Sequence, residues 1–66
     1  MKILREFHLK GALEQHNMDF LQKIPGKPEI LYSPKEKKLI VEGSEDALMV
    51  VKKYLKRIDN FIYWTT

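Results

Sequence analysis

Apolar and polar residues alternate at the start of the chain. Ile3, Phe7 and Leu9 fall on one side of an extended segment, interrupted by Arg5, whereas the other side is mainly polar: Lys2, Glu6, His8 and Lys10, together with Leu4. Successive side chains of a β-strand point to opposite faces of a sheet, so a period of two predicts a half-buried strand. We expect this strand to end at Gly11.

A helical period follows between residues 12 and 24. The apolar residues that would share one helix face are Leu13, Phe20, Leu21 and Ile24. Two starting points fit the pattern: a helix from Ala12, or a shorter helix that begins after Asn17 as its N-cap. Both interpretations place a helix over residues 18–24, and the Pro-Gly pair that follows ends it.

A hairpin is predicted next. Two β-prone triplets, residues 30–32 and 39–41, flank a polar segment rich in lysine. Pro34 suits the second position of a type I turn, and the lysines keep that turn in water. Gly43 closes the second strand of the hairpin.

The strongest helix signal begins at Ser44, a favourable N-cap residue. Glu45 and Asp46 lie in the first turn, where the helix dipole favours negative charge. The apolar stripe consists of Ala47, Leu48, Val51, Tyr54, Leu55 and Ile58. Basic residues gather toward the opposite end, where the dipole favours positive charge: Lys52, Lys53, Lys56 and Arg57.

These elements predict a small α+β domain in which two helices pack on one face of a three-stranded sheet. Its order is β-α-β-β-α, and the domain spans residues 1–60. We expect the core to contain Phe7, Leu21, Ile24, Ile40, Val51 and Leu55. Residues 61–66 then form an aromatic C-terminal tail.

Composition narrows the class of protein. The 66 residues suffice for one domain, and the absence of cysteine excludes disulfides and thiolate metal sites. No apolar run approaches the roughly 20 residues that span a bilayer, and the charged first residues lack the apolar centre of a signal peptide. We therefore expect a cytoplasmic protein that does not contact membranes.

The residues provide no catalytic or metal-binding arrangement. His8 and His16 are the only histidines and lack metal-ligand spacing, so His8 is expected on the solvent face of its strand. The serines, Ser33 and Ser44, are explained by a turn and a cap. We predict that the chain is not an enzyme and uses no cofactor or metal. Its formal charge of +3 is compatible with a polyanionic partner.

Two passages resemble the KH family of single-stranded nucleic-acid-binding domains, especially the short KH-like domains of bacterial proteins such as PhoH-like ATPases. One is Phe7-His8-Leu9-Lys10-Gly11 followed by a helix that ends at Ile24. The other is Leu39-Ile40-Val41-Glu42-Gly43-Ser44 leading into a helix that begins Glu45-Asp46-Ala47. The resemblance covers residues 3–58 and implies binding of single-stranded RNA or DNA.

The chain departs from that family at the GxxG loop, which clamps the nucleic-acid backbone. Gly11 supplies the first glycine, but Glu14 stands at the second and would repel phosphate. The nucleic-acid-binding residues implied by the resemblance are Lys10, Gly11, Lys23 and Lys27, with residues near Ile30 and Ile40 forming the walls of a groove. Because domains with a degenerate loop also serve as protein contacts, that function is implied equally.

Three aromatic residues in the tail, Phe61, Tyr63 and Trp64, admit three interpretations. They cover an open edge or face of the sheet, they bind a protein partner or a second copy of the chain, or they stack on bases. The second interpretation defines the alternative function. That alternative is a small protein-interaction or regulatory protein of the kind found in phage and accessory genomes, either monomeric or a homodimer.

Overall fold

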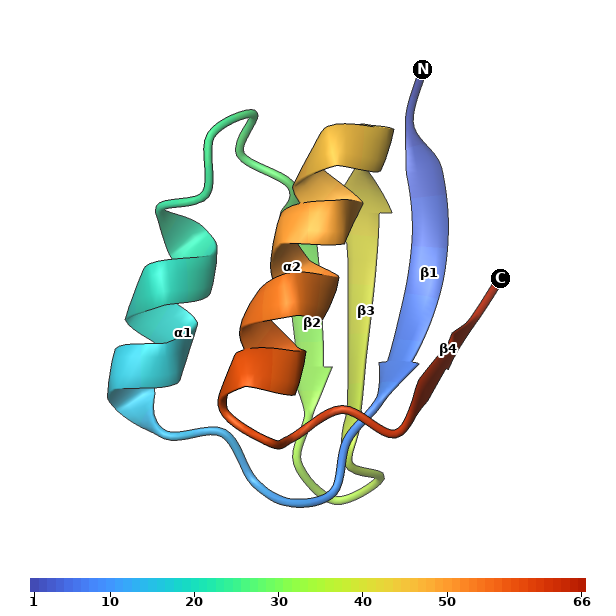
Figure 1. Ribbon diagram of the computed structural model, residues 1–66. Coiled ribbons are helices and arrows are strands. Elements are labelled where there is room, and N and C mark those ends of the chain that lie inside the picture. Colours follow the sequence, from blue (N-terminus) through green and yellow to red (C-terminus); the bar gives the residue numbers. More distant parts are fainter.

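Two helices lie on one face of a four-stranded antiparallel sheet in the computed structural model, which describes residues 1–66 (Figure 1). The elements are β1 (Ile3–His8), α1 (Gln15–Gln22), β2 (Glu29–Ser33), β3 (Lys38–Gly43), α2 (Glu45–Arg57) and β4 (Tyr63–Thr65). The strands are ordered β2-β3-β1-β4, so β1 and β3 are central. This β-α-β-β-α-β order is the split βαβ, or ferredoxin-like, arrangement.

The sheet has one strand more than the sequence predicted. Part of the expected tail forms β4, which pairs with β1 so that Trp64 lies opposite Phe7. The two rings pack with their centroids 5.3 Å apart. A strand of three residues is too short to show a period, and only its packing against β1 identifies it. The predicted β-α-β-β-α order therefore accounts for the first five elements and omits the sixth.

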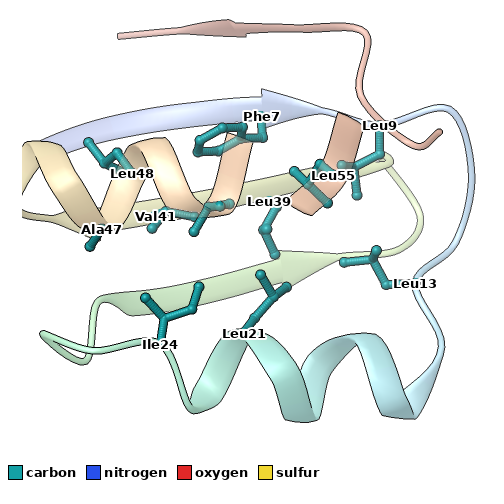
Figure 2. Close-up of a cluster of buried hydrophobic side chains, with 11 residues drawn as sticks. Phe7, Leu9, Leu13, Leu21, Ile24, Leu39, Val41, Ala47, Leu48 and Leu55 are labelled. Carbon is teal, nitrogen blue, oxygen red and sulfur yellow. The ribbon is translucent and has the colours of Figure 1, made fainter. Parts of the chain in front are cut away.

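The core fills the space between the helices and the covered face of the sheet (Figure 2). Its buried hydrophobic residues are Phe7, Leu9, Leu13, Leu21, Ile24, Leu39, Val41, Ala47, Leu48, Val51 and Leu55. Five of the six predicted core residues are therefore confirmed.

Ile40 is the exception. Leu39 and Val41 are buried on the covered face, so the alternation of β3 turns Ile40 to the open face, where it is only partly buried. Three consecutive apolar residues fit either phase of a strand. The pairing decides between them, because Leu39 lies opposite the buried Phe7.

Helix α1 begins at Gln15, between the two predicted starting points, with Glu14 as its N-cap. Asn17 is therefore inside the helix and is not its cap. Its side-chain oxygen accepts a hydrogen bond of 2.9 Å from the Glu14 amide, which is one half of a capping box. Its side-chain amide donates to the Tyr54 hydroxyl of α2, also at 2.9 Å. The helix start is thus set by a local capping box, and the same asparagine ties α1 to α2.

The second half of the chain folds as predicted. The β2–β3 hairpin forms around its polar turn, and the Ser44 hydroxyl caps α2 by accepting a hydrogen bond of 3.2 Å from the Ala47 amide. Neither helix is long and apolar enough to cross a membrane.

Gly43 ends β3 at a point of close approach between two segments. A Cβ atom at this position would lie 2.9 Å from the Cβ atom of Pro28, closer than such atoms come in proteins. Both residues are buried. Glycine is therefore required here by contact rather than by an unusual backbone angle.

Candidate functional site

The four predicted nucleic-acid-binding residues form two separate pairs. Lys10 and Gly11 follow β1 directly, at the end of the sheet that also carries the β2–β3 turn (Figure 1). Lys23 and Lys27 follow α1 and lie at the opposite end of the domain. The structure does not bring the four residues into one site.

The backbone of Gly11 is already hydrogen-bonded within the protein. Its N–H donates to the Asn60 side-chain oxygen at 2.8 Å, and the Asn60 side-chain amide donates to its carbonyl oxygen at 3.2 Å. A Cβ atom at Gly11 would meet nothing within 4 Å, so neither contact nor backbone angle requires glycine here. This amide is therefore not free to hold a phosphate in the manner of a GxxG loop.

Lys10 forms an ion pair with Asp59, with a distance of 2.7 Å between Nζ and Oδ1. Both side chains are exposed, and exposed pairs contribute only about 0–1 kcal/mol to stability. Exchanging Asp59 for a phosphate oxygen would therefore cost Lys10 little.

Basic residues from three distant segments meet at one end of the molecule. We call this the hairpin end: residues 9–14 after β1, residues 34–38 at the β2–β3 turn, and residues 53–60 at the end of α2 (Figure 1). Its basic residues are Lys10, Lys35, Lys37, Lys38, Lys53, Lys56 and Arg57. With seven of the 12 basic residues and three of the nine acidic ones, this end has a formal charge of +4 in a chain of +3.

Most of this positive charge has no partner within the protein. Among the seven basic residues, only Lys10 and Lys38 form ion pairs. The opposite end carries Glu29, Glu42 and the acidic first turn of α2, together with Lys2, Lys23 and Lys27. With five basic and six acidic residues, the chain outside the hairpin end sums to a formal charge of −1, so the excess of positive charge lies at the hairpin end.

These basic residues are visible in the sequence, but there the lysines of the hairpin turn and the basic residues of α2 belong to two separate segments. The order of elements contained the missing signal. A short connection after β3 makes α2 run back along the sheet, which returns the C-terminal end of α2 to the end where β3 began. Topology, rather than spacing in the sequence, therefore assembles the basic end.

The aromatic residues of the predicted tail divide into two kinds. Phe61 and Trp64 are partly buried against the core, and Lys52 Nζ lies 4.6 Å from the centroid of the Trp64 ring. Phe61 and Trp64 thus cover the edge of the sheet, which is one of the three interpretations of the aromatic tail. Tyr63 instead lies on the open face, 51% exposed, and its ring stacks on His8 with centroids 4.1 Å apart.

The open face of the sheet is apolar toward its other edge. Leu31 and Leu4 are exposed and flank the partly buried Ile40. They border a shallow concavity of about 600 Å³ that Ile30 and Lys27 also line. Ile30 and Ile40, the expected walls of a groove, thus line a concavity that contains neither Lys10 nor Gly11.

No three histidine, aspartate or glutamate side chains converge in a way that would hold a metal ion. No protein-family model, curated protein or solved structure matches this chain. The likeness to KH domains accordingly stays a prediction from the residues, and the function has to be argued from the geometry and charge of the side chains.

Proposed function

We propose that this chain is a small module without catalytic activity that binds single-stranded RNA or DNA through its hairpin end. The observation that carries the proposal is the charge of +4 gathered there from three segments. Phosphate contacts from lysine and arginine provide most of the affinity of sequence-independent nucleic-acid binding.

Helix-dipole complementation explains part of this charge but not all of it. Lys56 and Arg57 occupy the last turn of α2, where a positive charge stabilises the helix even in the absence of a ligand. Lys35 and Lys37 lie in a turn between strands, where no helix end needs them. Their position beside the helix terminus therefore supports a shared external partner.

Salt dependence tests the proposal. Five basic residues of the hairpin end lack an ion pair: Lys35, Lys37, Lys53, Lys56 and Arg57. If each neutralises one phosphate, log K should fall with log salt at a slope of about −3.5, or roughly 100-fold between 50 and 200 mM salt. Fluorescence anisotropy with a labelled oligothymidylate or oligouridylate measures this slope. A protein that binds neither oligonucleotide at 50 mM salt would rule the proposal out.

Paired charge reversals locate the interface. Lys35→Glu with Lys37→Glu should abolish oligonucleotide binding, whereas Lys23→Glu with Lys27→Glu, at the opposite end, serves as the matched control and should change the affinity only a few-fold. All four side chains are exposed, so both variants should fold. Equal losses in the two variants would contradict an interface at the hairpin end.

A second candidate function, protein interaction, is favoured by the apolar strip of Leu4, Ile40 and Leu31 on the open face. Leu31 is 69% exposed, and exposed apolar side chains that adjoin one another mark protein contact sites. Such contacts depend little on salt. Self-association that persists at high salt and is lost in Leu31→Asp, measured by analytical ultracentrifugation, would support this candidate.

A further inference from the structure

One aromatic ring near the hairpin end is left facing water. Tyr63 lies directly opposite His8 in the pairing of β4 with β1, and the two rings are nearly parallel, at 8°. His8 covers one face of the Tyr63 ring. Because β4 is an edge strand, no further strand of the sheet covers the other face. The tyrosine thus presents a flat aromatic surface at the side of the sheet.

One lysine, Lys38, lies in the same row of the sheet as this ring. Across the open face, Tyr63 pairs with His8, His8 with Lys38, and Lys38 with Ser33, the last residue before the hairpin turn. The next row along the strands contains Glu6, whose Oε1 lies 3.3 Å from Lys38 Nζ and 3.7 Å from His8 Nε2. The negative charge of Glu6 disfavours a phosphate in the middle of the open face. A phosphate backbone is therefore favoured only on the part of this face that lies toward the hairpin end.

The need to anchor β4 to the sheet does not by itself explain why position 63 carries an exposed aromatic ring. Cross-strand aromatic pairs do stabilise strand pairing, and the stack on His8 contributes to it. Trp64 already fixes the strand, however, through its contact with Phe7 on the covered face. Tyr63 leaves half of its surface exposed beside Ile62, which is also exposed. Exposed aromatic area on a face that leads to the unpaired lysines of the hairpin turn, Lys35 and Lys37, is the combination that single-stranded nucleic acid uses.

From this arrangement, and resting on the proposed function, we infer that the outer face of the Tyr63 ring stacks on one unpaired base. The backbone of the bound strand then runs from Tyr63 toward Lys38 and the hairpin turn. Every base has an aromatic face, so this contact selects single strands over duplexes without strong preference for sequence.

The test compares two labelled probes of equal length, an oligothymidylate and an oligonucleotide with abasic sites throughout, at 50 mM salt. The wild-type protein should bind the oligothymidylate about 5- to 150-fold more tightly, the range expected for stacking one base. Tyr63→Leu should bind both probes with the affinity of the abasic one. Tyr63→Phe, which keeps the ring, should retain the preference.

Two controls make the result specific. Ile62→Ala alters an exposed neighbour without a ring and should leave the preference unchanged. Unaltered Trp64 emission in Tyr63→Leu would show that β4 is still docked. A folded Tyr63→Leu protein that keeps its preference for bases would overturn the inference. Equal binding of both probes by the wild type would also overturn it while leaving the proposed function intact, whereas binding of neither probe would overturn both.

Discussion

Helix α2 carries a cap, charges that complement its dipole and an apolar stripe within its own segment, whereas α1 has only a local capping box and relies more on side chains of other elements. In α2, Ser44 caps the start, the first turn is acidic, the last turn is basic, and four residues are buried in the core. Helix α1 has neither an acidic first turn nor a basic last turn, and only Asn17 and Leu21 are buried within it. Its eight residues are also fewer than an isolated helix needs for stability.

The difference shows which parts of a small domain are determined locally. The position of α2 follows from cap, dipole and apolar stripe, all of which lie close together in the sequence. Helix α1 begins at a local capping box, but its place in the fold depends on contacts such as the hydrogen bond between Asn17 and Tyr54, two residues that only the fold brings together. We therefore expect the two helices to respond to substitution in different ways.

The largest effect should come from the apolar stripe of α2. Leu55 is completely buried, and Leu55→Ala should lower the free energy of unfolding by about 2–5 kcal/mol through lost burial and a cavity. Urea denaturation measures the change. Leu31→Ala, at an exposed position, is the control and should change stability by less than about 0.5 kcal/mol. A small loss in Leu55→Ala would mean that the stripe does not hold α2.

A smaller but still clear loss should follow from Asn17→Ala. This change removes both hydrogen bonds of the side chain and leaves the Tyr54 hydroxyl without its partner, which should cost about 1–3 kcal/mol. A double-mutant cycle with Tyr54→Phe isolates the contact between the helices. Additive losses would show that the contact does not position α1, whereas coupling above about 0.5 kcal/mol would support it.

The smallest effect should come from the cap of α2. Ser44→Ala removes one hydrogen bond to the Ala47 amide and should lower stability by about 1 kcal/mol. Ser33→Ala, in a strand and outside any cap, should have little effect under the same urea titration. If Ser44→Ala proved more harmful than Asn17→Ala, the ranking of local and tertiary contributions would be reversed.

The predictable part of the fold is the part with a repeating pattern. Strand β1, the hairpin and α2 each show a period, a turn signal or a cap, and each forms where expected, although β1 ends at His8 rather than at Gly11. Strand β4 is too short for a period, and the side of β3 that faces the core depends on pairing with β1. The docking of α1 depends on Tyr54 of α2. These three features require knowledge of contacts between segments that lie far apart in the sequence.

The candidate site also combines features that the sequence shows directly with features that depend on contacts between distant segments. Charge and aromatic content were visible in the sequence, but their grouping was not. Lys23 and Lys27 are separated from Lys10 because α1 lies between them, and Gly11 lost its expected role because Asn60 occupies its backbone. The stack of His8 on Tyr63 depends on the unforeseen strand pairing. No pattern within a single segment contains that information.

The contact between Gly43 and Pro28 bears on how this sequence can change by mutation. Gly43→Ala alone places two Cβ atoms 2.9 Å apart. If Pro28→Gly occurs first, that contact disappears, and the nearest remaining atom of residue 28 is its Cα, 3.3 Å from the new methyl group. The same substitution at residue 43 is thus tolerated better in one genetic background than in the other. The two positions form an epistatic pair, in which the order of the mutations decides how much steric strain the intermediate protein carries.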